Sequence, residues 1–170
     1  MPHPATLSAA ALLKECSVER TRRSGPGGQH RNKVETAIVL THRPTGVQAE
    51  ASERRSQPEN LAVATTRLRV RLAVEVRQPV DLEELPSALW RSRCVQQRIR
   101  VNPEHDDFPT LLAEALDTLA GCDWEVTTAA QKLACSTSQL GKFLQLEAPA
   151  FSLLNQQRQS RGWQALKPRL

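Results

Sequence analysis

Apolar and polar residues alternate in three short stretches of the first half of the chain, which is the pattern of half-buried β-strands. A short helix capped by Ser8 is expected just before the first of them. The turn residues Pro44-Thr45-Gly46 separate the second strand from the third. The predicted elements are a helix over Ala9–Glu15 and strands over Cys16–Val18, Ala37–Arg43 and Val47–Ala51.

After Ser56 the apolar spacing changes to steps of three and four, which predicts a long helix. Ser56 and Glu59 stand at capping-box spacing, and Pro58 is tolerated in the first turn. The residues of the expected apolar face are Leu61, Ala64, Leu68 and Leu72. We therefore predict an α+β fold, a small, mostly antiparallel sheet packed by one long helix. Arg67 and Arg71 on this helix are interpreted as solvated or snorkelling side chains rather than specific RNA ligands.

The second half of the chain predicts an α-helical C-terminal appendage, and the expected divisions are 1–78, 79–102 and 103–170. Residues 79–102 read as a linker segment that becomes basic toward its end. A helix is expected from Pro109, with its buried stripe at Leu112, Ala115, Leu116 and Leu119.

Residues 127–144 have the spacing of a helix-turn-helix unit. Lys142 is the only cation on its second helix, and phosphate binding needs more, so we favour a packed helical pair over a nucleic-acid reader. The chain then closes with a sparse basic tail, 155–170, which either binds RNA or docks through Trp163.

Charge is unevenly distributed along the sequence. The 170 residues contain 23 Lys and Arg against 18 Asp and Glu, a net charge of +5. The excess falls within residues 1–80, whereas residues 81–170 are close to neutral, so a polyanionic partner is expected for the first half.

The sequence also limits where the protein works and what it needs. The N-terminus does not read as a signal or transit peptide, and no apolar run reaches membrane-spanning length. The spacing of the cysteines does not suggest a zinc site or a disulfide framework. We expect a cytoplasmic monomer without a membrane association, a cofactor or a metal.

Residues 24–33, SGPGGQHRNK, are the most informative segment. The adjacent glycines Gly27 and Gly28 allow positive φ and a close approach to another surface. Cations on both sides indicate that this surface is a phosphate backbone. Gln29 does not titrate, so it hydrogen-bonds rather than acting as a base. We interpret the segment as a loop that inserts into a polyanion and positions a small molecule with an amide.

With the segments that follow it, this loop resembles the catalytic domain of class I peptide chain release factors and of single-domain ribosome-rescue hydrolases. The landmarks are the SGPGGQ loop, Asn32-Lys33, Thr41-His42 with Pro44-Thr45-Gly46, and Arg55-Ser56-Gln57, in the family's order over about 16–75. The resemblance is to the short, codon-independent rescue members in particular, because 170 residues leave little room for codon-reading domains.

The resemblance implies a role for each residue of the loop. Gln29 would orient water at the peptidyl-tRNA ester, and its backbone N–H would stabilise the developing negative charge. Gly27 and Gly28 would supply the backbone shape, completing the catalytic set. The residues expected to bind ribosomal RNA are Arg22, Arg23, His30, Arg31, Asn32, Lys33, Arg54 and Arg55. The implied partners are the ribosome, peptidyl-tRNA and a glutamine methyltransferase that acts on Gln29.

Together these expectations predict ribosome-dependent hydrolysis of peptidyl-tRNA, in release or in codon-independent rescue of stalled ribosomes. Two alternatives stay open. The chain could be a catalytically idle ribosome- or RNA-binding module that kept the fold, or a DNA-binding regulator that uses residues 127–144.

Overall fold

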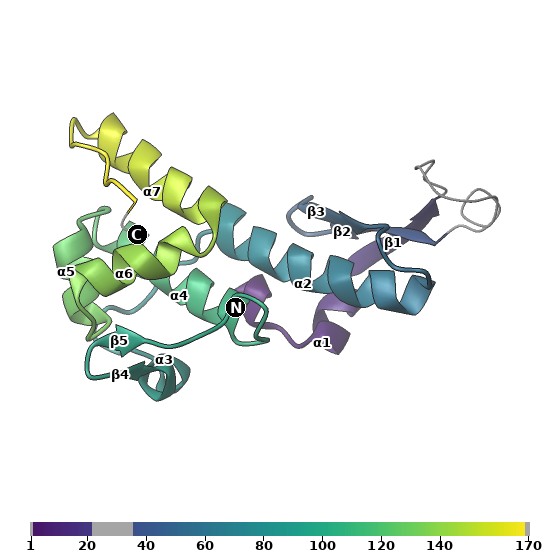
Figure 1. Ribbon diagram of the computed structural model, residues 1–170, viewed down its shortest axis with the longest axis horizontal. Coiled ribbons are helices and arrows are strands. Elements are labelled where there is room, and N and C mark those ends of the chain that lie inside the picture. The colour runs from purple at the N-terminus through teal and green to yellow at the C-terminus, as the bar shows by residue number, and fades with distance from the viewer. Residues whose placement is uncertain (1, 22–35, 169–170) are drawn as a thin grey trace. The chain divides into compact units, whose positions relative to one another are not determined.

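The computed structural model (Figure 1) describes residues 2–21 and 36–168. The chain divides into two compact units, Met1–Val76 and Arg77–Leu170, which we describe separately. Among the described residues, no helix combines the length and the apolar character needed to cross a lipid bilayer.

The first unit is built on a three-stranded antiparallel sheet in the order β1-β2-β3. Its strands are β1 (Cys16–Thr21), β2 (Ala37–His42) and β3 (Gln48–Ala51). Cys16 pairs with His42 at one end of β1, and Thr21 pairs with Ala37 at the other. The first strand therefore extends three residues beyond the predicted Cys16–Val18.

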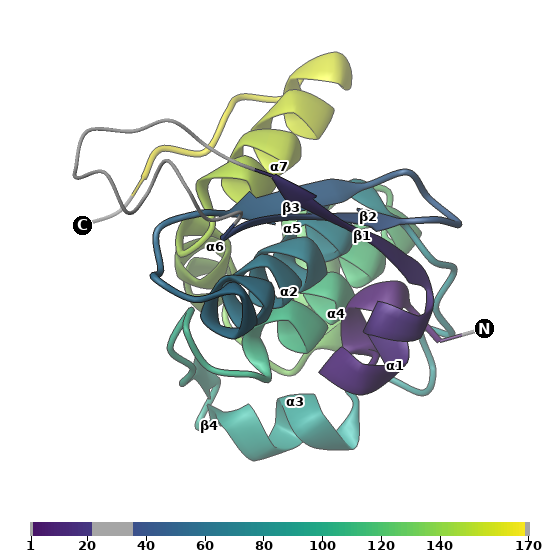
Figure 2. The ribbon, with the colours of Figure 1, turned by 90° about the vertical axis from the view of Figure 1, so that its right-hand side faces the viewer.

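One face of the sheet is covered by helices, and Figure 2 shows α1 and α2 on the same side of it. The short α1 (Ala9–Lys14) follows the 3-10 turn η1 (Pro4–Thr6), and the long α2 is Gln57–Glu75. The Ser56 hydroxyl accepts from the Glu59 backbone N–H, which is the first of the two bonds of a capping box, and it donates to the Glu59 carboxylate at 2.7 Å. This arrangement confirms the predicted α+β class.

The buried face of α2 follows the predicted stripe with one exception. Ala64, Leu68 and Leu72 are fully buried, whereas Leu61 is only half-buried. Arg67 and Arg71 extend along the sheet instead of standing free in solvent. Their guanidinium groups donate to the backbone carbonyls of Glu50 and Gln48 in β3.

The turn between β2 and β3 is fixed by a buried histidine. His42 lies between the Thr45 hydroxyl, 2.7 Å from its Nδ1, and the Glu15 carboxylate, 3.0 Å from its Nε2. Gly46 has a φ of +73°, which glycine adopts without strain. The Thr41-His42 and Pro44-Thr45-Gly46 landmarks thus shape the sheet.

The C-terminal part of the second unit consists of the apolar α4 (Phe108–Gly121) and three further helices. The others are α5 (Val126–Lys132), α6 (Thr137–Gln145) and α7 (Ala148–Ser160). The predicted stripe Leu112, Ala115, Leu116 and Leu119 is fully buried. The helix α7 occupies part of the segment that the sequence suggested as a basic tail, and within that segment the described residues 161–168 are non-helical.

The expected linker, 79–102, contains folded elements. It forms α3 (Ala88–Arg93) and a two-stranded ribbon of β4 (Cys94–Val95) and β5 (Arg98–Ile99). Trp90 anchors this segment: its ring is 1% exposed, its Nε1–H donates to the Leu133 carbonyl at 2.7 Å, and it meets Phe143 edge to face. The segment that the sequence suggested as a linker is therefore part of the folded second unit.

A buried ion pair lies at the start of this unit. Arg77 Nη1 donates to Asp117 Oδ1 at 2.8 Å, and the backbone N–H of Gln78 donates to the same oxygen at 3.1 Å. Burial raises the pKa of Asp117 to about 6, although Arg77 and the Gln78 N–H oppose that shift. The folded protein therefore holds this proton at pH values where the unfolded chain releases it.

This ion pair predicts a pH dependence of the free energy of unfolding. Because the folded pKa of Asp117 lies above its ordinary value of 3.8, the group's stabilising contribution is full at low pH and is lost as the pH rises through about 6. The change amounts to about 3 kcal/mol. In Asp117→Asn the amide oxygen still accepts both hydrogen bonds but does not titrate. Urea denaturation from pH 4 to pH 7 should show a steeper decline for the wild type, and parallel curves would contradict this assignment.

Candidate functional site

The predicted catalytic loop extends from the open end of the β1–β2 pair. Gly27, Gly28 and Gln29 lie in residues 22–35, outside the described residues. So do most of the predicted RNA ligands: Arg22, Arg23, His30, Arg31, Asn32 and Lys33. The two ends of this segment are well defined, because Thr21 pairs directly with Ala37 across the sheet.

The stem of the loop is formed by two strands of different character. β2 is mostly buried, with Ala37, Ile38 and Leu40 in the core. In β1 the residues from Ser17 to Arg20 are all exposed, so this strand contributes Arg20 to the surface next to the loop. Hydrophobic burial thus fixes β2, and the antiparallel ladder fixes β1 against it.

A buried asparagine on α2 supports the other side of the loop. Asn60 is 0% exposed, and its Nδ2 donates to the carbonyls of Thr36 at 2.7 Å and Arg54 at 3.1 Å. Its Oδ1 accepts from the Arg54 backbone N–H at 2.9 Å. Thr36 is the first described residue after the loop. One amide thus ties the return end of the loop to the segment that contains Arg54 and Arg55.

Asn60 was not among the predicted site residues, although the sequence contains a sign of it. Asn60 stands four residues before Ala64, at the head of the buried stripe of α2. Asparagine is a poor residue for a helix interior, and a buried amide needs partners for its donors and acceptor. A polar residue at the start of an apolar stripe therefore indicates a bond to another part of the chain.

Arg54 and Arg55 are the two predicted RNA ligands that the structure describes. Both side chains are exposed in the bend between β3 and α2. Neither guanidinium forms an ion pair with a described residue. Asn60 holds the Arg54 backbone beside Thr36, at the return end of the loop, and both exposed cations are available to an anionic partner.

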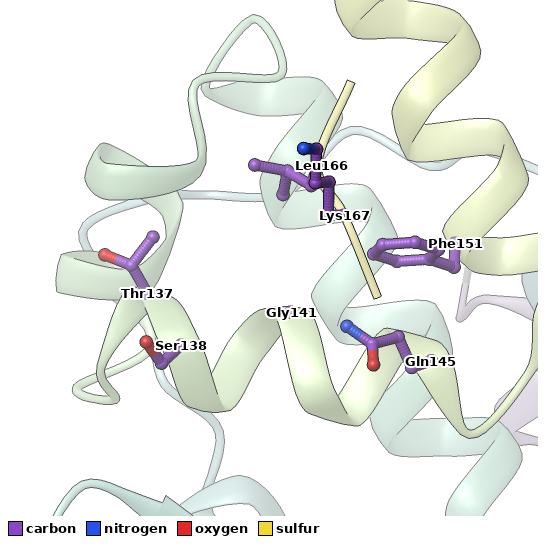
Figure 3. A pocket seen from close by; sticks show the side chains of 7 residues that line it. All are labelled: Thr137, Ser138, Gly141, Gln145, Phe151, Leu166 and Lys167. Carbon is purple, nitrogen blue, oxygen red and sulfur yellow. The ribbon is translucent and has the colours of Figure 1, made fainter. Parts of the chain in front are cut away.

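The described part of the chain contains no metal-binding cluster. Three or more His, Cys, Asp or Glu side chains do not gather in positions to hold an ion in the residues that the structure covers. A surface pocket of about 310 Å³ lies in the second unit between α6, Phe151 of α7 and the C-terminal segment at Leu166 and Lys167 (Figure 3). Its lining includes no acid, so it does not supply an acid–base pair for hydrolysis.

Three peptide chain release factors illustrate what this chain is similar to. The chain is 32% identical over 96 residues to "Peptide chain release factor 1-like, mitochondrial" of Mus musculus, which covers 56% of this chain and 24% of that protein. It is 40% identical over 86 residues to chloroplastic "Peptide chain release factor PrfB1" of Arabidopsis thaliana, covering 49% and 19%. With "Peptide chain release factor 1" of Leptothrix cholodnii it shares 47% over 64 residues, covering 38% and 18%.

The similarity covers only a part of this chain and only a part of each relative. This chain aligns with about a fifth to a quarter of the length of these relatives. The family model of the RF-1 domain matches residues 11–104, more than half of the chain. That range contains the whole sheet, the predicted catalytic loop, α2 and the β4–β5 ribbon. The chain therefore belongs to the RF-1 domain family, the catalytic domain of class I peptide chain release factors.

Proposed function

We propose that this protein hydrolyses the ester bond between a nascent peptide and its tRNA on the ribosome, without reading a stop codon. The observation that carries this proposal is the SGPGGQ sequence at the open end of the β1–β2 pair, within the residues that match the RF-1 domain. An idle binding module would not need Gln29 in that loop.

In this proposal the sheet brings the reactive loop to the ester. The side chain of Gln29 admits and orients the attacking water, and its backbone N–H stabilises the oxyanion or the leaving hydroxyl. Gly27 and Gly28 give the backbone the shape that aims this N–H. Catalysis in this proposal depends on how the backbone N–H of Gln29 is positioned. A donor that is already fixed needs little energy to reorient when negative charge develops in the transition state.

The cations around the loop bind ribosomal RNA in the same proposal. Arg54 and Arg55 are exposed and form no ion pair with a described residue, and Asn60 holds the Arg54 backbone in place. The basic residues of the segment 22–35 would add further phosphate contacts. These contacts orient the loop without reading a sequence.

The codon-independent part of the proposal is supported by residues 105–170, which lie outside the family match and fold around their own core. We expect this unit to serve recruitment by a route other than codon reading.

A release assay on defined ribosomes tests both parts of the proposal. Ribosomes with labelled peptidyl-tRNA would carry a stop codon, a sense codon or no codon in the A site, and release would be followed by filtration. We expect similar rate constants in all three cases. Release only at stop codons would contradict codon independence but support hydrolysis. Ribosome binding without release in any case would favour the idle module instead.

A further inference from the structure

We propose that the second unit binds the phosphate backbone of structured RNA through an arginine surface formed by the last turn of α3 and the β4–β5 ribbon. Its residues are Arg91, Arg98 and Arg100. This site is separate from the predicted catalytic loop. The choice of RNA over DNA rests on the proposed function, whereas the surface itself follows from the charges and contacts below.

The charge balance of the second unit singles out these three arginines. Residues 88–101 contain no acid. Within this stretch, the charge of Arg93 is neutralised by the Asp107 carboxylate. Several other cations of the unit are also paired with acids: Arg77 with Asp117, Lys132 with Glu83, and Arg161 with Asp123. Arg91, Arg98 and Arg100, by contrast, are exposed and form no ion pair with any residue in 2–21 or 36–168.

The geometry of the ribbon places Val95 and Arg98 together on its exposed face. Val95 and Arg98 are direct cross-strand partners, so their side chains share a face. Alternation along the backbone brings Arg100 to the face of Arg98. Val95 is 51% exposed, which shows that this face is open to solvent. The acids that follow, Glu104 and Asp106, belong to the turn before α4.

The ribbon is held in place by neighbours on its other side. The backbone N–H of Arg100 donates to the Arg93 carbonyl at 2.9 Å, and the Ser136 N–H donates to the Gln97 carbonyl at 3.4 Å. The Cys94 thiol donates to the Ala134 carbonyl at 3.7 Å. Gln96 and Gln97 both have positive φ, as a tight two-residue hairpin turn requires. Because the backbone of the ribbon is already fixed, only its exposed side chains lose conformational freedom when they bind a partner.

The chemistry of the face matches a phosphate backbone. Arginine presents a planar fork of donors that fits phosphate oxygens bidentately. The amides of Gln96 and Gln97 add neutral donors at the exposed tip. The ribbon has no aromatic residue on which an unpaired base could stack, so a duplex backbone fits it better than single-stranded bases. Groove reading by the adjacent α6 is not favoured, because Lys142 is its only cation.

The experiment measures binding of the full-length protein to a labelled RNA hairpin by fluorescence anisotropy, at about 50 to 200 mM salt. The test variant is R91Q/R98Q/R100Q. The control R158Q/R161Q/K167Q removes the same charge from the same unit, at the C-terminal tail. It is chosen there because Arg158 lies over the Trp163 ring and Arg161 is paired with Asp123, as expected for a docked tail. We expect the test variant to bind about tenfold or more weakly, with a salt dependence shallower by roughly two to three units of slope. The control should stay close to the wild type.

Several outcomes would overturn the proposal. An equal loss in both triple variants would show that total charge, not this surface, drives binding. Tighter binding of a DNA duplex of the same sequence would indicate a DNA reader. If the triple variant is not folded by circular dichroism, Arg98→Glu alone, at an exposed position, must still weaken binding. Gln29→Ala should bind the hairpin normally, so a failure of the release assay leaves this test unaffected.

Discussion

Replacing Gln29 with Ala should reduce ribosome-dependent peptide release by about a hundredfold or more while binding to the ribosome stays near normal. The variant removes the amide that is proposed to orient water and introduces no charge. The rate constant for release at saturating protein would be measured beside the dissociation constant for ribosomes. A loss confined to the rate constant is the result expected for a group that acts at the ester.

Two further variants separate the side chain of Gln29 from the backbone around it. Gly28→Ala keeps the amide but adds a Cβ where the loop needs conformational freedom, so it should be at least as damaging. Ser24→Ala, in the same segment but outside the proposed catalytic set, serves as the control. Full release by Gln29→Ala or Gly28→Ala would refute the assignment of the loop.

Asn60→Asp should lower the release rate by about tenfold or more, although Asn60 belongs to α2 and not to the loop. The aspartate keeps the shape but loses both donors, and its carboxylate would face the carbonyls of Thr36 and Arg54. Leaving buried carbonyls without donors costs about 1–3 kcal/mol each, so this end of the loop should shift. A Thr36 displaced by a fraction of an ångström would change where the loop delivers its amide.

A matched substitution distinguishes positioning from simple destabilisation. Thr65 is also buried on α2, and its hydroxyl donates to the Leu61 carbonyl at 2.7 Å without touching the loop ends. Thr65→Val should lower the free energy of unfolding by about 1 kcal/mol and leave release per folded molecule unchanged. For Asn60→Asp we expect a lower rate constant at saturation with a nearly constant half-saturating concentration. If both variants lose release only in proportion to their lost stability, Asn60 has no positioning role.

Much of the first unit could be predicted from sequence because its rules are local. Alternation located β2 and β3, the Ser56–Glu59 spacing located the start of α2, and steps of three and four located its buried face. The residues that make up each of these signals lie within about twenty positions of one another in the sequence. The predicted catalytic loop stays a prediction, and it was recognised because four landmarks stand in the family's order over about 16–75.

The features that sequence did not predict depend on distant partners. Asn60 and Arg69 are polar residues on the buried face of α2, and each bonds a backbone carbonyl far away in sequence, Arg69 that of Ala5 at 3.1 Å. The strands β4 and β5 have two residues each, too few for alternation to show. The helix α7 buries only Ala150 and Leu154, so its pattern is weak, and its last residues read as a tail.

The pairing of Thr21 with Ala37 has a consequence for protein engineering. Because the two ends of the loop leave the sheet as cross-strand partners, the intervening residues form a cassette with a fixed span between its ends. Such a cassette can be transplanted onto another antiparallel hairpin without changing the host's backbone path. The insertion point must keep the alternation of side chains between the two faces of the host sheet. A shift of one residue in the host would turn the whole cassette toward the opposite face.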